Sequence, residues 1–338
     1  MVKKRIWDAH GHLFTWATTP KRAYLDRKAY PLASAVPVLW EILSSPLLKE
    51  FIQLGKTLYN LAAKKDIDSF DIAKEYAETY QAAARAMAIQ YRLSGVTDFN
   101  LLLIDFYGWN YRWDILKQWA IGKDIARICA KEGVKCHLVG GIDPHRPGAT
   151  KLLSEHHKDL AGVKLYLPIS EATQREVYDF AEVCHFFGLP IFSHCSPGGI
   201  GELEFKASPD YVWELLALHT SLKWCFCHGG GDRGSWRSTV ERACLEFEGA
   251  HLDLSFRDKA IYDPDSFFKR LNGYAYMEAT TVPAIAEKVL WGTDRPLHQI
   301  YYPLDTLVKQ YKESTSWLLW QCISWWNTAS FMEKKTKG

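Results

Sequence analysis

The stretch Arg5-Ile6-Trp7-Asp8-Ala9-His10-Gly11-His12-Leu13 predicts a buried strand that ends in two histidines. Side chains two positions apart on a strand project from the same face, so His10 and His12 can direct both imidazoles to one point. A strand with this ending is a candidate for the edge of a site. The rest of the sequence decides what kind of sheet contains it.

Short apolar runs rich in β-forming residues recur along the chain and alternate with longer helical patterns. Near-continuous apolar strands that alternate with helices indicate a parallel sheet covered by helices. The predicted helical stretches are Ile115–Lys131, Gln174–Phe187, Pro209–His219, Ser235–Phe247, Pro264–Leu271 and a final segment from about Leu304 towards Phe331. The eight predicted strands are Arg5–Leu13, Asp98–Asp105, Val134–Ile142, Gly162–Leu167, Pro190–His194, Lys223–His228, His251–Ser255 and Lys288–Gly292.

The spacing of these strands selects a (β/α)₈ barrel, a TIM barrel, as a single domain over residues 1–338. From Leu101 to Trp291 the strands recur roughly every 32 residues, as eight units in a barrel of ~250 residues require. The first interval is about 60 residues too long by the same measure. We therefore expect a helical insertion at about 15–95, which is either a lid over the barrel mouth or a dimerisation element.

One part of the insertion carries a clear helical pattern, over Phe70–Leu93. Six of its residues fall on a single apolar stripe, which predicts an amphipathic helix. They are Tyr76, Tyr80, Ala83, Ala84, Met87 and Tyr91.

Composition narrows the class of protein. The net charge is +2, which gives no electrostatic case for nucleic acid or an anionic membrane surface as a partner. The eight cysteines lie in apolar strand-like or helix-like runs, and Met1-Val2-Lys3-Lys4-Arg5 leads into a strand with no apolar signal region. We expect reduced thiols and a cytoplasmic protein without a membrane span. Its expected partner is a small-molecule substrate, and a homodimer could form through the insertion.

The chemistry of such a barrel lies where the strands end, because all eight carboxyl ends converge on one mouth. Polar residues occupy several of these ends. The fourth strand carries Lys164, the fifth ends in Ser193-His194-Cys195, the sixth in Cys227-His228-Gly229 and the eighth runs into Gly292-Thr293-Asp294. Together with His10 and His12 they form a metal-ligand constellation that is much more specific than any one of its members.

The pattern of these residues resembles that of the amidohydrolase superfamily. The resemblance is greatest to its amidohydrolase-related branch (amidohydrolase 2), which includes aromatic-acid decarboxylases and lactonases. Asp8-x-His10-x-His12 matches the family's first-strand motif, and His194, His228 and Asp294 match its fifth-, sixth- and eighth-strand residues. Gly162-Val163-Lys164 resembles members with a lysine on the fourth strand. In two-metal members a carboxylated lysine at that place bridges the ions. The resemblance covers nearly the whole chain outside the insertion.

The residue types suit these roles on chemical grounds as well. Neutral imidazoles and one carboxylate favour Zn²⁺, with Mn²⁺ or Fe²⁺ as alternatives, in one or two ions. The predicted metal ligands are His10, His12, His194 and Asp294, with Lys164 added if it is carboxylated. His228 is either a second-metal ligand or a free acid–base group, and Asp294 could bind the metal, accept a proton from water, or both.

Three alternatives stay open around the site. Asp8 could touch the metal or only orient a ligand. Lys164 could be carboxylated or paired with an acid, and Tyr166 shares its strand face and could border the pocket. Arginines that follow the strands could clamp a substrate carboxylate, although surface ion pairing is their default; the candidates are Arg146, Arg257 and Arg295.

Two reactions use this constellation. The first is hydrolysis of a C–N or C–O bond in an amide, lactone or ester of a small carboxylate-bearing or aromatic molecule, through metal-activated water. The second is non-oxidative decarboxylation of an aromatic or unsaturated acid. Lys164 favours hydrolysis, because single-metal decarboxylases do not need it. A non-enzymatic barrel would have no use for an open metal site.

Overall fold

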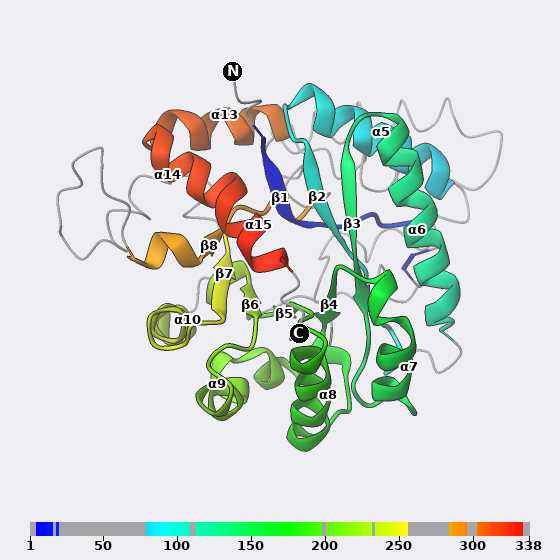
Figure 1. Ribbon diagram of the computed structural model, residues 1–338, viewed down its shortest axis with the longest axis vertical. Helices are drawn as coiled ribbons and strands as arrows, with labels where there is room; N and C mark the ends of the chain where they lie inside the picture. The colour runs from blue at the N-terminus through cyan, green and yellow to red at the C-terminus, as the bar shows by residue number, and fades with distance from the viewer. Residues whose placement is uncertain are drawn as a thin grey trace, which may run out of the picture.

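Eight parallel strands form one sheet in the order β1 to β8, as the spacing predicts (Figure 1). The computed structural model describes residues 5–15, 18–19, 79–108, 113–197, 201, 203–231, 234–255, 284–295 and 303–333. Backbone hydrogen bonds from Ala9 to Trp291 and from His12 to Arg295 join β1 to the segment after β8. The sheet thus curls into a barrel. The strands are β1 Trp7–Gly11, β2 Asp98–Leu102, β3 Lys135–Gly141, β4 Gly162–Leu165, β5 Ile191–His194, β6 Trp224–Cys227, β7 Ala250–Asp253 and β8 Val289–Leu290.

Helices surround the barrel at the positions that the periodicity predicts. Two of them begin at side-chain caps, which are Asp114 before α6 and the Thr173–Glu176 capping box of α8. These caps satisfy amide groups that the helix leaves open. Helix α7 was not among the predicted helices, and the predicted helix Pro264–Leu271 lies outside the described residues. The helices are α5 Tyr80–Leu93, α6 Ile115–Lys131, α7 Ala149–His156, α8 Gln174–Phe186, α9 Trp213–Leu218 and α10 Gly234–Glu246.

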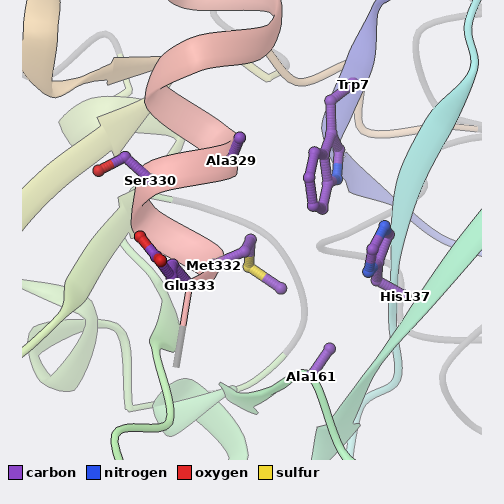
Figure 2. A pocket seen from close by; sticks show the side chains of 7 residues that line it. All are labelled: Trp7, His137, Ala161, Ala329, Ser330, Met332 and Glu333. Carbon is purple, nitrogen blue, oxygen red and sulfur yellow. The ribbon is translucent and has the colours of Figure 1, made fainter. Parts of the chain in front are cut away.

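The C-terminal helical segment is confirmed but is divided. It consists of α13 Leu304–Ser314, α14 Trp317–Gln321, a π-helical turn Cys322–Trp326 and α15 Asn327–Met332. Figure 1 shows α15 crossing one end of the barrel. Phe331 and Met332 of α15 join Trp7 in the apolar cluster inside the barrel, so this helix closes the amino end of the strands. A pocket remains there between Trp7, His137 and Met332 (Figure 2).

Most of the predicted insertion, including residues 20–78, lies outside the described residues, and the hypothesis of a lid or subunit contact stays a prediction. Its last part is the helix α5, and the predicted stripe is confirmed there. Ala83, Ala84, Met87 and Tyr91 are buried in the cluster between the helices and the barrel. α5 contacts α6, and it therefore belongs to the ring of helices.

The eight cysteines are unpaired, and all but Cys136 are buried. In the part of the chain that the structure describes, no helix combines the length and the apolar character that a bilayer crossing requires.

A buried carboxylate connects β1, α5 and the segment after β8. Asp8 accepts hydrogen bonds from the Tyr91 hydroxyl at 2.8 Å and from the Thr293 amide at 3.0 Å. It also accepts from the Thr293 hydroxyl and from the His10 amide. Burial raises the pKa of Asp8 to about 6, and these hydrogen bonds act in the opposite direction. Asp8 therefore holds the ends of β1 and β8 together.

We predict that Tyr91→Phe lowers the free energy of unfolding by about 1–3 kcal/mol, because it removes one donor from a buried carboxylate. Tyr80→Phe is the matched control, since Tyr80 on the same helix donates to Asp124 in a partly exposed position. Denaturant unfolding of both variants measures the difference. Equal losses in the two variants would show that the Tyr91–Asp8 hydrogen bond adds nothing specific.

Candidate metal centre

Three side chains converge at the carboxyl end of β1. The Nε2 atoms of His10 and His12 lie 3.0 Å apart, and Oδ1 of Asp294 lies 3.5 Å from the first and 3.4 Å from the second. Ligands of a tetrahedral ion with bonds of about 2.0–2.1 Å are separated by about 3.4 Å. The three atoms therefore have the spacing of ligands around one small cation, and they form a candidate metal-binding group.

Local departures from regular strand geometry bring these residues together. The pairing of β1 with β2 shifts between Asp8 and Gly11, where the strand turns His10 and His12 towards one point. A Cβ at Gly292 would lie 2.8 Å from the Cβ of His10, so glycine permits the close approach of the chain after β8. Asp294 itself has a φ of 56°, and His228 has a φ of 65°. Such left-handed conformations in residues other than glycine cluster at functional sites.

Burial sets the protonation of the group. His10 and His12 are almost fully enclosed, and burial, with the nearby positive charge of Lys164, holds their pKa values well below the usual range. Both imidazoles are therefore neutral and keep a lone pair. Burial raises the pKa of Asp294 to about 8, with Asp253 and Asp8 adding to the effect. A cation between these ligands would offset the cost of the buried carboxylate.

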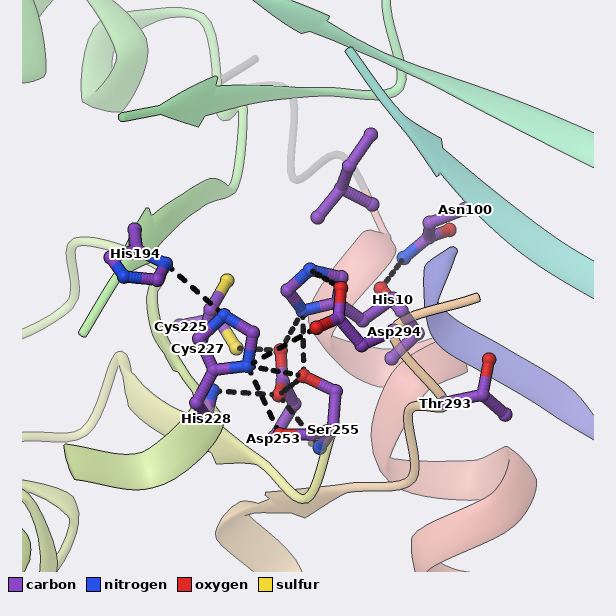
Figure 3. A network of polar contacts seen from close by, with 12 residues as sticks. His10, Asn100, His194, Cys225, Cys227, His228, Asp253, Ser255, Thr293 and Asp294 are labelled. Carbon is purple, nitrogen blue, oxygen red and sulfur yellow. Dashed lines mark hydrogen bonds and ion pairs between the residues drawn. The ribbon is translucent and has the colours of Figure 1, made fainter. Parts of the chain in front are cut away.

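Asp253 at the end of β7 orients the first ligand. Its Oδ2 atom lies 2.8 Å from Nδ1 of His10, and its Oδ1 atom accepts from the amide of His228 at 2.9 Å (Figure 3). The hydroxyl of Ser255 donates to Asp253 and contacts Nδ1 of His10 at 2.9 Å. A carboxylate at Nδ1 keeps the proton there and leaves Nε2 of His10 for the metal. The Leu102 carbonyl at 2.6 Å does the same for Nδ1 of His12.

His194 and His228 form a second pair beside the first. Nε2 of His228 lies 3.1 Å from Nδ1 of His194, and Nδ1 of His228 lies 3.0 Å from the carbonyl oxygen of Ser255. If Nδ1 of His228 donates to that carbonyl, its Nε2 accepts from Nδ1 of His194, and the lone pair of the His194 ring is then on Nε2. His194 lies outside the three-residue group but is tied to it through His228, whose Nδ1 is 4.0 Å from Oδ2 of Asp294.

The remaining predicted residues occupy different places. Lys164 is buried inside the barrel, and its Nζ donates to Sγ of Cys227 at 3.1 Å. The ring of Tyr166 lies against His194, with centroids 4.6 Å apart, at the edge of the site as expected. Arg146 pairs with both oxygens of Asp105.

The other two candidates for the arginine clamp are Arg295 and Arg257. Arg295 is buried and donates from Nε to Gln90 on α5 at 3.0 Å, which directs its guanidinium towards the helix layer. Arg257 lies outside the described residues. Asp8, which could have touched the metal, instead faces Tyr91 and Thr293.

The sequence analysis missed Asp253 and Ser255, although a signal was present. The seventh strand was predicted as His251–Ser255, and its polar residues two positions apart share one face at its end. Reading that strand end like the others would have placed both residues at the mouth.

We predict that Asp253→Asn weakens Mn²⁺ binding by about 10- to 100-fold, because His10 loses the carboxylate that fixes its tautomer. Mn²⁺ prefers nitrogen and oxygen ligands, so its binding, followed by electron paramagnetic resonance, reports on this group. Asp98→Asn is the matched control, since Asp98 is an equally buried carboxylate at the start of β2 and should leave the affinity unchanged. Unaltered Mn²⁺ affinity in Asp253→Asn would contradict the orienting role.

Comparisons with known proteins agree with this geometry. The amidohydrolase family model matches residues 7–315. An apo crystal structure of an Agrobacterium tumefaciens protein is 12% identical, with 97% of this chain and 96% of that chain covered and a TM-score of 0.53. A putative amidohydrolase from Staphylococcus aureus is 12% identical, with 78% and 95% covered and a TM-score of 0.50. No curated protein matches.

At this identity the two structures show a shared fold, whereas the family match spans nearly the whole chain. The matched range includes every strand of the barrel and each of the predicted ligands. The chain therefore belongs to the amidohydrolase family of metal-dependent hydrolases.

Proposed function

We propose that the protein hydrolyses a C–N or C–O bond in an amide, lactone or ester of a small carboxylate-bearing or aromatic molecule. The observation that carries the proposal is the convergence of His10 Nε2, His12 Nε2 and Asp294 Oδ1 at the ends of β1 and β8. Neutral nitrogen donors with one carboxylate fit Zn²⁺ best, with Mn²⁺ or Fe²⁺ as alternatives. We assign His194 as a further ligand through its Nε2 atom.

The two oxygens of Asp294 have different roles in this proposal. Oδ1 faces the Nε2 atoms of His10 and His12, while Oδ2 is turned towards His228. A divalent ion in this group lowers the pKa of water and polarises a carbonyl. Oδ2 of Asp294 is then placed to accept a proton from water and return it to the leaving group.

His228 supports this reaction without accepting the proton itself. Its amide and Nδ1 are held by Asp253 and Ser255, so the ring has one orientation. Nε2 of His228 contacts His194, which favours a role in orienting His194 and polarising substrate over a role in binding a second ion. Tyr166, whose ring is tilted against that of His194, would border an aromatic or acyl group of the substrate.

Non-oxidative decarboxylation of an aromatic or unsaturated acid is the second candidate. Lys164 favoured hydrolysis in the sequence because a carboxylated lysine can bridge two ions. In the structure its Nζ contacts the thiol of Cys227, and this contact favours a single ion in the His10 group. A single ion suits either reaction, so the products must separate them.

We predict that the purified protein carries about one to two equivalents of a divalent transition ion. His10→Ala and His194→Ala should each reduce the metal content and abolish activity without unfolding the protein, because each removes a nitrogen ligand. Metal analysis by mass spectrometry and a thermal melt test both points. His156→Ala, on the outer helix α7, is the control and should keep the metal. Full metal retention in both ligand variants would overturn the assignment.

We predict that the metal-loaded protein releases acid from a panel of amides, lactones and esters, and releases no CO₂ from aromatic or unsaturated carboxylic acids. Chromatographic assay of the carboxylate product records hydrolysis, and an enzyme-coupled CO₂ assay records decarboxylation. Asp294→Asn should abolish either activity, since it removes the proton acceptor. Release of CO₂ without acid formation would establish the decarboxylase alternative.

A further inference from the structure

Two thiols lie inside the barrel directly below the His10 group. Cys225 and Cys227 stand two residues apart on β6, and both are fully buried in the cluster inside the barrel. In the register of the sheet Cys227 pairs with His194, whereas Cys225 pairs with Phe192 one step deeper. Figure 3 shows both cysteines next to Asp253 and His228. The proposed reaction uses neither thiol.

A carboxylate completes a possible ligand set. Sγ of Cys225 lies 3.8 Å from Oδ2 of Asp253, and the two sulfurs and a carboxylate oxygen all lie within 4.8 Å of one another. A tetrahedral Zn²⁺ ion has Zn–S bonds of about 2.3 Å and Zn–O bonds of about 2.0–2.2 Å, so its sulfur and oxygen ligands are about 3.6 Å apart. Small side-chain rotations would bring these three atoms to that separation.

The charges around the thiols are compatible with a bound divalent ion. Nζ of Lys164 donates to Sγ of Cys227, and within the described residues no carboxylate lies within ion-pair distance of this buried amine. Two thiolates and Asp253 carry three negative charges, while a divalent ion and the Lys164 ammonium carry three positive ones. A buried cluster of charges is tolerated when it is paired and neutral overall.

We propose that Cys225, Cys227 and Asp253 form a second metal site, for a thiophilic divalent ion such as Zn²⁺ or Cd²⁺, with Lys164 as its charge partner. Sulfur ligands select soft ions, in contrast to the nitrogen and oxygen ligands of the His10 group. On binding, the two thiols each lose a proton to solvent. Because Asp253 also contacts His10, the ion stabilises the residue that orients the first ligand.

Cadmium titration of the purified protein tests this proposal. A thiolate bound to Cd²⁺ gives a charge-transfer absorption in the near ultraviolet, which the His10 group cannot give because it contains no sulfur. We expect the band to saturate at about one equivalent of Cd²⁺ for this one site. Cys225→Ser and Cys227→Ser should each reduce it strongly. Cys184→Ser, a buried thiol on the remote helix α8, should leave it unchanged.

Two further variants keep the test decisive if a serine variant fails to fold. Lys164→Met retains both thiols and should weaken Cd²⁺ binding by about 10-fold or more, because the charges no longer balance. His12→Ala should abolish the activity and leave the band intact, which separates this site from the proposed function. Absence of the band in the wild-type protein, or a band that survives in both serine variants, would overturn the proposal.

Discussion

The hydrogen bond between Asp253 and His10 is the contact on which the site depends. Both side chains are fully buried, and Oδ2 of Asp253 lies 2.8 Å from Nδ1 of His10. This contact fixes the imidazole tautomer and directs Nε2 towards His12 and Asp294. The same carboxylate accepts from the amide of His228 and the hydroxyl of Ser255, so one residue of β7 orients groups on β1, β6 and its own loop. A buried charge tied to this many donors has little freedom to move.

Several residues of the candidate site lie where the backbone departs from regular geometry. The register of β1 shifts before Gly11, and His228 and Asp294 adopt positive φ values directly after β6 and near the end of β8. Regular strands would alternate their side chains between the barrel interior and the helices. His10 and His12 share one face because they are two positions apart, whereas His228 and Asp294 adopt positive φ values at the site. This local strain is sustained by the Asp8 hydrogen bonds with Tyr91 and Thr293, which hold the same strand ends.

The sequence predicts the architecture well because the strand signal is periodic and the barrel order is fixed by that period. The strand count, their parallel pairing and the helices α6 and α8 are confirmed. The convergence of His10, His12 and Asp294 also follows from reading strand ends. The direction of a long side chain does not follow from such a reading. Arg295 stands beside a predicted ligand, yet its guanidinium reaches Gln90 in the helix layer. Arg146 is held by Asp105, a partner 41 positions away that no local pattern indicates.

The polarity of the barrel interior changes with depth, and this change explains why Lys164 can be buried there. At the mouth, neutral imidazoles and carboxylates surround a place for a cation. One layer below, Lys164 would repel that cation and would be costly to bury alone. The thiol of Cys227 lies 3.1 Å from its amine and gives it a hydrogen-bond acceptor within the apolar surroundings of Phe192, Val139 and Leu290. Lys164 on β4 and Cys227 on β6 therefore form a polar layer between the apolar cluster and the candidate metal centre, and Asp253 connects that layer to the candidate ligands above it.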